Sequence, residues 1–599
     1  MKFNKQAIQS SYINPIFLTD SYKLSHISFT SKGVQVIYSN FTPRFTEYLA
    51  AKFKTFDGGI VWFGLQAAIQ KIVYEYWELN FFQRNKEEVI EEAKRFLGTY
   101  IGMENLKHFE DLHDLGYLPI RIKALPEGCV ISKGIPCFTI TNTHDDYQWL
   151  PNYFESVFSA EVWKPMTTAT IGRILKRIAI DASIETTGSA QGADFQLHDF
   201  SFRGQSGIES GAASGGGMLL STLGTDNIPS IAWMEHYYNA NIQTDEIAYS
   251  VPAGEHSVTT LGIQIEAKKI LEEQQLKGLF VPKIEDVLES AERRYVGYVL
   301  NQFPTGIVSY VADSYDYFGF LEKTLPAMKD EIQARDGKFV VRGDSGDPVE
   351  IIAGINIPDF SHVDILHHAT VDAAYAKIPD VVSEGGSFEV IFKHKGQIYK
   401  SNYHIVVECG QFEDVIVDKA HPYELTTQEK GTIAHLFDVF GGHVNSKGYI
   451  ELNEKIGMIY GDGINESRML EIFKRLKAQG FATTNVVFGI GSYTLNMLSR
   501  DDLGTAVKAT SAVVDGDIVA IYKDPKTDTS KKSARGLLKV QQLSNGMLEL
   551  LDEVSVIGES EGMLDTVFEN GEMVLPTTYN EVVDNLKIYD EIWRNQLVS

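Results

Sequence analysis

The chain has 599 residues, more than one ordinary domain uses, because hydrophobic cores usually stop growing at roughly 250–300 residues. Hydrophobic residues make up 44% and charged residues 22%, a globular composition that excludes a disordered or fibrous chain. The formal net charge of −26 disfavours general binding to nucleic acid or to anionic lipid. An anionic small substrate is compatible with this charge if basic side chains gather in one pocket.

Cysteine usage and the chain start bear on the compartment. The three cysteines, Cys129, Cys137 and Cys409, form no CxxC pair and cannot build a disulfide framework, which indicates a reducing compartment. No apolar run approaches the ~18 residues of a membrane span. The first residues, MKFNKQAIQSSYINP, lack the apolar stretch of a secretory signal. We therefore expect a cytoplasmic protein that binds neither membrane nor nucleic acid.

The opening third of the chain mixes strand and helix. Between Leu118 and Ala124, apolar residues alternate with Arg121 and Lys123, which predicts a half-buried strand. Further on, the apolar spacing becomes helical. This predicted apolar stripe consists of Ile171, Ile174, Leu175, Ile178 and Ala182.

From about residue 195 to 491, short apolar runs end in polar and glycine-rich clusters and then give way to helical segments. These repeated units predict parallel strands with crossover helices, closed or nearly closed into a barrel. In such barrels the chemistry lies at the carboxyl ends of the strands, which is where the polar clusters fall. The six runs begin at Phe195, Ile247, Ile307, Phe339, Gly457 and Val486. Between the last two, we expect a helix that begins at Asn465 and ends at Gly480.

Residues from about 355 to 430 interrupt this pattern. Within them, SFEVIFKHKGQIYKSNYHIVVE predicts a β-hairpin with its turn at His394-Lys395-Gly396. We interpret the stretch as an insertion between two barrel strands and assign it no function.

The polar clusters contain residue types that suit a phosphorylated substrate. Arginines beside the glycine turns at Gly461 and Gly489 can bind phosphate oxygens, with backbone N–H groups available where no Cβ intrudes. Carboxylates at strand ends can hold Mg²⁺ or ribose hydroxyls. The sequence has no P-loop, dinucleotide fingerprint or zinc motif, so separate loop ends are expected to bind phosphate. The set comprises Arg203, Asp226, His256, Asp313, Arg342, Asp344, Asp462 and Arg500.

Nine short motifs follow one another along the chain: NPIFLTDSYKLSH (14–26), GYLPIRIKALPEG (116–128), LHDFSFRG (197–204), LGTDN (223–227), YSVPAGEHS (249–257), VSYVADSYD (308–316), RGDSGDP (342–348), YGDG (460–463) and YKDPKTD (522–528). In this order they resemble the nicotinamide phosphoribosyltransferases, a family of type II phosphoribosyltransferases. The resemblance spans nearly the whole chain except the insertion.

This resemblance implies an α/β fold with two parts. One is the irregular (β/α) barrel of type II phosphoribosyltransferases, and the other is an α+β domain formed by the N- and C-terminal segments. We expect an N-terminal α+β domain at 1–165 and a catalytic barrel with the insertion at 166–500. A C-terminal segment at 501–599 is expected to pack with the N-terminal domain.

The resemblance also implies an activity. The family joins nicotinamide to 5-phosphoribosyl-1-pyrophosphate, giving nicotinamide mononucleotide and pyrophosphate in NAD salvage. It works with Mg²⁺, and ATP serves as a co-substrate whose hydrolysis is coupled to the synthesis. The family enzyme is a homodimer whose active sites contain residues from both subunits.

The resemblance implies nicotinamide-binding roles for residues within the matching motifs. Phe200 and the partner subunit's Tyr22 resemble the two aromatic walls around the pyridine ring. Asp226 resembles the residue that accepts the carboxamide N–H₂ and repels the carboxylate of nicotinate, while Arg203 matches a contact to the carboxamide oxygen side and the product phosphate. The nicotinamide site by this resemblance also contains Ser250 and Ser309.

The remaining residues match ribose, phosphate and ATP functions. His256 matches the histidine that the family phosphorylates from ATP, and Asp313 and Asp344 are grouped with it as catalytic. The expected ribose and phosphate contacts are Arg342, Gly461, Asp462 and Gly491, and the expected basic set is Arg44, Arg500, Lys508, Lys523 and Lys531. No metal ligands are assigned.

Two departures and two alternatives accompany the resemblance. Ser492 replaces a glycine of the family's FGxGG loop, and Ala506 replaces a serine that contacts phosphate in some members. One alternative is a nicotinate phosphoribosyltransferase, against which Asp226 argues. The other is a non-catalytic nucleotide-binding homologue, which would be expected to lose His256, Arg342 or Asp344.

Overall fold

The computed structural model describes residues 13–381, 386–408, 411–523 and 534–598. The chain forms two compact units. Unit 1 comprises residues 1–181, 190–250 and 489–599, and unit 2 comprises residues 182–189 and 251–488. The expected domain boundaries at 165 and 500 stay a prediction.

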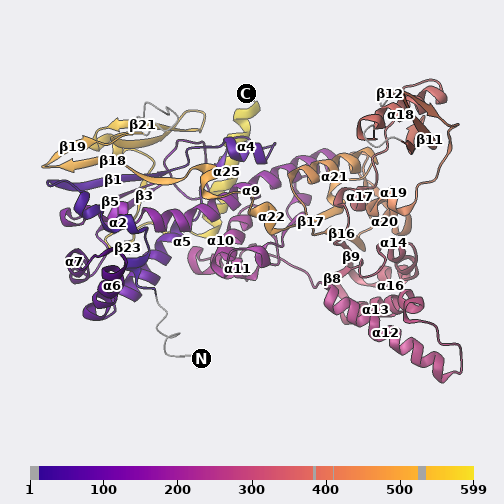
Figure 1. Ribbon diagram of the computed structural model, residues 1–599, viewed down its shortest axis with the longest axis horizontal. Coiled ribbons are helices and arrows are strands. Elements are labelled where there is room, and N and C mark those ends of the chain that lie inside the picture. The colour runs from indigo at the N-terminus through magenta and orange to yellow at the C-terminus, as the bar shows by residue number, and fades with distance from the viewer. Residues whose placement is uncertain (1–12, 382–385, 409–410, 524–533, 599) are drawn as a thin grey trace. The chain divides into compact units, whose positions relative to one another are not determined.

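An antiparallel seven-stranded sheet lies in unit 1, in the order β19-β18-β1-β5-β3-β22-β23 (Figure 1). The N- and C-terminal parts of the chain share this sheet, because Phe41 of β1 pairs with Phe138 of β5 on one side and with Val507 of β18 on the other. The strand predicted near residues 118–124 is β3, and its Ile120 and Ile122 are buried. The strand bounds are β1 (Val34–Thr42), β3 (Ile120–Ala124), β5 (Phe138–Asn142), β18 (Ala506–Val514), β19 (Asp517–Ala520), β22 (Asp565–Glu569) and β23 (Glu572–Met573).

A buried arginine of unit 1 joins two long helices, α9 (Glu155–Thr187), which belongs to unit 1 up to Asp181, and α25 (Tyr579–Val598). Arg173 of α9 is 2% exposed and donates to both carboxylate oxygens of Asp57, at 2.9 and 2.8 Å. Its Nε donates to Asp590 of α25 at 2.6 Å. The predicted apolar stripe of α9 is buried, which confirms the helical spacing; it consists of Ile171, Ile174, Leu175, Ile178 and Ala182.

Unit 1 also contains a short parallel pair of strands, β6 (Leu197–Asp199) and β7 (Gly224–Thr225), each followed by a helix. These helices are α10 (Ile208–Leu219) and α11 (Ile228–Tyr238). The run at 247–249 was predicted as a strand, but Tyr249 makes only an isolated parallel bridge to Gly224. Because β7 has only two residues, the ladder beside it cannot extend.

Unit 2 contains parallel strands in the order β17-β16-β9-β8, with β17 continuing across the boundary into unit 1 (Figure 1). These strands match four of the predicted runs, so the α/β class with parallel strands is confirmed, while closure into a barrel stays a prediction. The bounds are β8 (Thr305–Val311), β9 (Asp336–Gly343), β16 (Ile456–Tyr460) and β17 (Val486–Ile490), with helices α12 (His256–Leu276), α13 (Leu288–Gln302), α17 (Pro348–Ala353), α20 (Thr432–Phe440) and α21 (Glu466–Ala478).

The helix predicted between the last two strands is α21. The Asn465 side chain accepts a hydrogen bond from the Arg468 backbone at 3.0 Å, which caps the helix start. Gly480 follows the helix with φ +85°, a conformation that favours glycine. Both predicted ends are confirmed.

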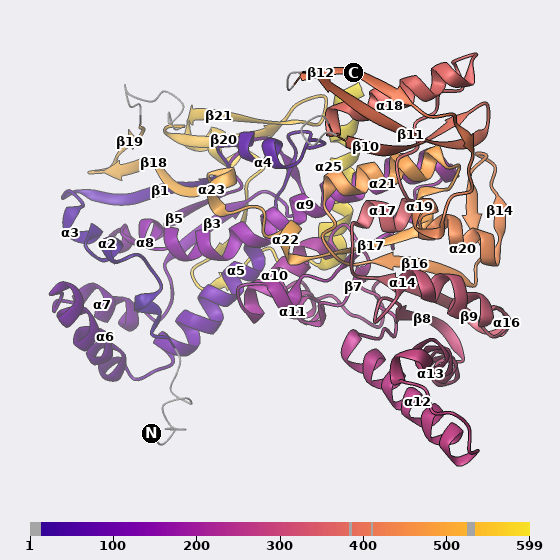
Figure 2. The ribbon, with the colours of Figure 1, turned by 45° about the vertical axis from the view of Figure 1, so that its right-hand side comes forward.

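The insertion forms a small layer of its own, with α18 (Leu366–Val381) packed on a sheet of β10 (Gly386–His394), β11 (Gln397–Glu408), β12 (Gln411–Val417) and β13 (His421–Pro422) (Figure 2). The predicted hairpin is confirmed, because His394 pairs with Gln397 across a turn of Lys395 and Gly396, both with positive φ. Its buried core includes Ala373, Val390, Phe392 and Tyr403.

In the described parts of the chain, no helix combines the length and the apolar character that crossing a membrane requires.

Candidate active site

The first group of predicted residues lies in unit 1, at the carboxyl ends of β6 and β7. Phe200 follows β6, and its backbone N–H donates to the Ile490 carbonyl at 3.0 Å. Asp226 follows β7, and its backbone N–H donates to the Asp199 carbonyl at 3.0 Å. The two parallel strands therefore deliver an aromatic ring and a carboxylate to neighbouring positions.

The Asp226 carboxylate is held by two side chains. The Nε2 of His198 lies 2.8 Å from Asp226 Oδ1, and the Ser250 hydroxyl donates to the same oxygen at 2.6 Å. His198 also meets Phe200 edge to face, with ring centroids 5.0 Å apart. The Asp226 side chain is 49% exposed, so this group is open to a ligand.

A buried aspartate supports the loop below this group. Asp199 is 1% exposed, and burial is the main cause that raises the pKa of its carboxyl above the usual value. It accepts hydrogen bonds from the Ser201 backbone at 2.8 Å and from the Asn227 amide at 3.2 Å. The loop that carries Phe200 is therefore joined to the loop that carries Asp226. Arg203, one turn further on, is exposed.

The second group lies in unit 2, at the carboxyl ends of β8 and β9. His256 is the first residue of α12, and its Nε2 lies 2.9 Å from Asp313 Oδ1. The Asp313 side chain is only 4% exposed, and its other oxygen accepts the Asp344 backbone N–H at 3.2 Å. Arg342 reaches to 3.7 Å from the Asp344 carboxylate. The predicted His256, Asp313, Arg342 and Asp344 are thus brought together.

Backbone pairing holds His256 in this place. Ser309 of β8 donates its backbone N–H to the Pro252 carbonyl at 2.9 Å and accepts from Gly254 at 3.1 Å. The chain just before α12 is thereby attached to β8. Ser309 itself is 5% exposed.

Asp462 belongs to the same acidic surroundings in unit 2. Gly461 directly follows β16, and Asp462 is the next residue. Burial chiefly raises the pKa of the Tyr460 hydroxyl, and the negative charges of Asp462, Asp344 and Asp313 add to this effect. No group of three or more potential metal-ligating side chains was found among the described residues.

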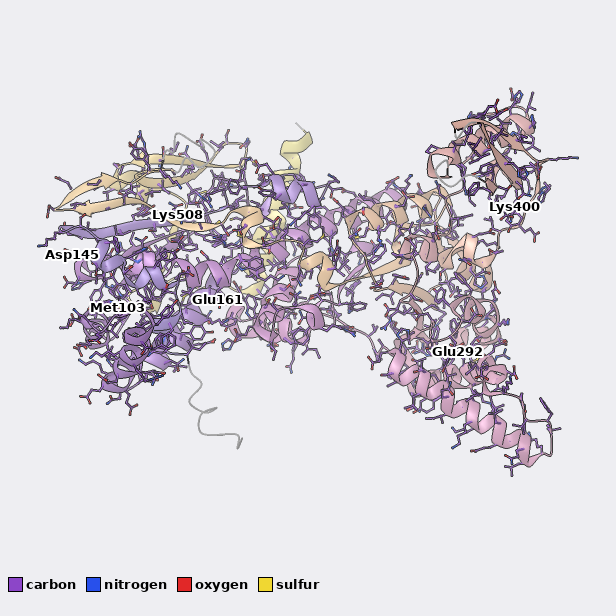
Figure 3. All side chains as sticks on the ribbon, viewed as in Figure 1. Met103, Asp145, Glu161, Glu292, Lys400 and Lys508 are labelled. Carbon is purple, nitrogen blue, oxygen red and sulfur yellow. The ribbon has the colours of Figure 1, made fainter. Side chains whose placement is uncertain are left out.

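The third group contains basic residues of unit 1. Lys508 of β18 (labelled in Figure 3) bonds Glu155 at 2.6 Å. Burial and Glu155 raise the pKa of the Tyr22 hydroxyl, whereas Lys508 and Arg500 oppose that rise, so these charges surround Tyr22. Burial and then the neighbouring Arg500 lower the pKa of Arg44.

The remaining predicted phosphate contacts are Gly491, Lys523 and Lys531. Gly491 is the residue before the short helix α22 (Ser492–Leu495). Lys523 is exposed. Lys531 lies outside the described residues.

The structure adds three residues that the sequence analysis missed: His198, Asp199 and Glu155. His198 and Asp199 lie inside the LHDFSFRG motif, and His198 shares one side of the chain with Phe200 because side chains alternate along a strand. The spacing of two residues between His198 and Phe200 could have indicated His198 from the sequence. No sequence feature indicated Glu155, because its partners Lys23 and Lys508 are far away in sequence.

Comparisons with known proteins place the chain in a family. The Nicotinate phosphoribosyltransferase (NAPRTase) family matches residues 195–571. The chain belongs to this family. A protein named nicotinamide phosphoribosyltransferase from Acinetobacter baylyi is 37% identical over 96% of this chain and 97% of its own length. A protein of the same name from Xanthomonas campestris pv. campestris is 29% identical over 95% of this chain and 98% of its own.

Among solved structures, human nicotinic acid phosphoribosyltransferase matches with a TM-score of 0.47 and 12% sequence identity. The match covers 96% of this chain and 94% of that chain.

Proposed function

We propose that this phosphoribosyltransferase uses nicotinamide, joining it to 5-phosphoribosyl-1-pyrophosphate to form nicotinamide mononucleotide and pyrophosphate in NAD salvage. The observation that carries the proposal is the Asp226 carboxylate, held by His198 and Ser250 beside the ring of Phe200. The name shared by relatives at 37% and 29% identity supports it.

The amide can be distinguished from the acid by charge. A carboxylate accepts a hydrogen bond from the carboxamide N–H₂ of nicotinamide, but it repels the carboxylate of nicotinate. An aromatic ring such as that of Phe200 can stack on the flat pyridine and exclude water from it. Asp226 and Phe200 together thus favour nicotinamide over nicotinate.

The sugar and phosphates require charge rather than acid–base chemistry. Pyrophosphate leaves the anomeric carbon as the ring nitrogen attacks, so catalysis consists mainly of positioning and electrostatic stabilisation. We assign Arg342, Asp344 and Asp462 to the ribose and phosphate, and the Arg44, Arg500 and Lys508 group to the pyrophosphate or nucleotide phosphates. Mg²⁺, which commonly binds through substrate phosphates with few protein carboxylates, would neutralise the leaving group.

We propose ATP coupling through His256. A carboxylate such as Asp313 only accepts hydrogen bonds, so His256 must carry its proton on Nε2. The other nitrogen, Nδ1, then has the lone pair that can attack the γ-phosphoryl group. The 45% exposure of the His256 side chain leaves room for that approach.

The proposal includes a homodimer and a cytoplasmic location. Tyr22 is 57% exposed, so its ring is available to a second subunit as an aromatic wall. The two described cysteines, Cys129 and Cys137, are buried free thiols, which is compatible with a reducing compartment.

The test is a product assay with 5-phosphoribosyl-1-pyrophosphate, Mg²⁺ and either nicotinamide or nicotinate. We expect nicotinamide mononucleotide, with a strong preference for nicotinamide. Asp226→Asn should narrow that preference about tenfold or more, because removing the charge removes the repulsion of nicotinate. Asp194→Asn, which changes an exposed aspartate paired with Lys176, is the matched control.

The outcomes separate the alternatives. Faster turnover of nicotinate than of nicotinamide would identify the chain as a nicotinate phosphoribosyltransferase. No product from nicotinamide or nicotinate would favour a non-catalytic nucleotide-binding homologue. An unchanged preference in Asp226→Asn would remove Asp226 from the amide contact.

A further inference from the structure

His198 lies between the two residues proposed to contact nicotinamide. Its Nε2 is 2.8 Å from Asp226 Oδ1, and its ring meets the ring of Phe200 edge to face with centroids 5.0 Å apart. The His198 side chain is 11% exposed, so both contacts are largely shielded from water. A change at this imidazole therefore affects the aromatic wall and the carboxylate together.

The β6–β7 pair is built to receive this imidazole. His198 is directly opposite Gly224 in the parallel register. A Cβ added at Gly224 would lie 2.7 Å from His198 Nδ1 and 2.7 Å from the Leu197 carbonyl oxygen, closer than real Cβ atoms come. The missing side chain of Gly224 thus leaves the space that the ring occupies.

We propose that His198 is a positioning residue that sets the preference for nicotinamide over nicotinate by orienting the Asp226 carboxylate. This inference rests on the proposed function. His198 and Ser250 both donate to Oδ1 of Asp226, and two donors on one oxygen fix the orientation of the carboxylate. His198 acts through Asp226 and needs no contact with the substrate.

A double-mutant cycle tests this relation. The ratio of kcat/KM for nicotinamide to kcat/KM for nicotinate is measured for the wild type, His198→Ala, Asp226→Asn and the double variant. We expect His198→Ala to lower the ratio about tenfold, which is the usual effect of losing one charge-assisted hydrogen bond. In the Asp226→Asn background, His198→Ala should change the ratio less than twofold, because the carboxylate that His198 orients is absent. Additive effects would overturn the inference.

A conservative variant separates positioning from a general structural role. His198→Gln keeps a side-chain N–H₂ donor for Asp226, so it should restore most of the ratio that His198→Ala loses. A His198→Gln ratio as low as that expected for His198→Ala, about tenfold below the wild type, would contradict the inference. If His198→Ala does not fold, this comparison decides alone.

The matched control is His236→Ala, which removes the histidine of an exposed pair with Glu75, 3.3 Å apart in the same unit. Its ratio of kcat/KM values should equal that of the wild type. If the wild type makes no nicotinamide mononucleotide, the proposed function fails and the inference with it. If the wild type makes the product but the cycle is additive, only the role of His198 fails.

Discussion

The hydrogen bond between His256 and Asp313 gives a sharp test of ATP coupling. Asp313 accepts from two donors, with one oxygen 2.9 Å from His256 Nε2 and the other 3.2 Å from the Asp344 backbone nitrogen. In Asp313→Asn the amide has only one acceptor oxygen. In one orientation the amide oxygen accepts from His256, and the N–H₂ group faces the Asp344 backbone N–H, so two donors oppose each other. In the other orientation the oxygen accepts from Asp344, and the N–H₂ group faces His256. In the second case the imidazole proton moves to Nδ1, and the nitrogen needed for attack is blocked.

Both arrangements are costly in this setting. Because the Asp313 side chain is 4% exposed, water cannot replace the lost acceptor. An unsatisfied buried donor costs about 1–3 kcal/mol, which disfavours the first arrangement relative to the second. The wrong histidine tautomer costs up to about 10⁴-fold in serine proteases, where an aspartate orients a histidine in the same way. We expect ATP stimulation to fall about 100-fold or to vanish.

The measurement is the ratio of nicotinamide mononucleotide formation with ATP to that without ATP, together with phosphorus NMR of the phosphorylated enzyme. Asp418→Asn is the control, because Asp418 faces His404 at 3.9 Å in an exposed pair of unit 2. An Asp313→Asn enzyme that keeps its ATP ratio within threefold would refute the reasoning. So would full phosphorylation of His256 in that variant.

Two further predictions concern stability. Burial raises the pKa of Glu292 (labelled in Figure 3) from 4.5 to about 7, so the folded protein loses stability as pH rises from about 4.5 to 7, by roughly 3 kcal/mol. Glu292→Gln should therefore reduce the loss of melting temperature between pH 5 and pH 8, and an unchanged loss would contradict this. Arg173→Met leaves the carboxylates of Asp57 and Asp590 without their shared buried cation, so it should destabilise unit 1 by about 3 kcal/mol. Urea unfolding measures this against Arg293→Met, an exposed control, and equal midpoints would disprove it.

Local structure was predictable where neighbouring residues decide it. The strand β3 follows from alternation, and the start of α21 follows from the capping side chain of Asn465. The hairpin turn follows from Gly396, because glycine adopts positive φ without strain. Tyr249 shows the limit, because a strand also needs a partner of sufficient length and β7 has only two residues.

The candidate site was predictable in its residue types but not in its contacts. Motifs pointed to Asp226, His256 and Asp313, and the structure shows which side chains hold them. His198 escaped the sequence analysis because a histidine in a strand is most often an ordinary packed residue. Its partner Asp226 lies 28 positions away, so no local pattern joins the two. The roles of the site residues, Mg²⁺, ATP and the homodimer stay predictions.

The sequence by itself determined the chemistry available to this protein, its parallel α/β class and its family, since spacing, charge and ordered motifs are properties of the chain alone. Only the tertiary structure decided that Gly224 lies opposite His198 and that Asp313 joins His256 to Asp344. The register between strands and the side chains that meet across it depend on packing between distant segments. That packing is absent from any short stretch of sequence.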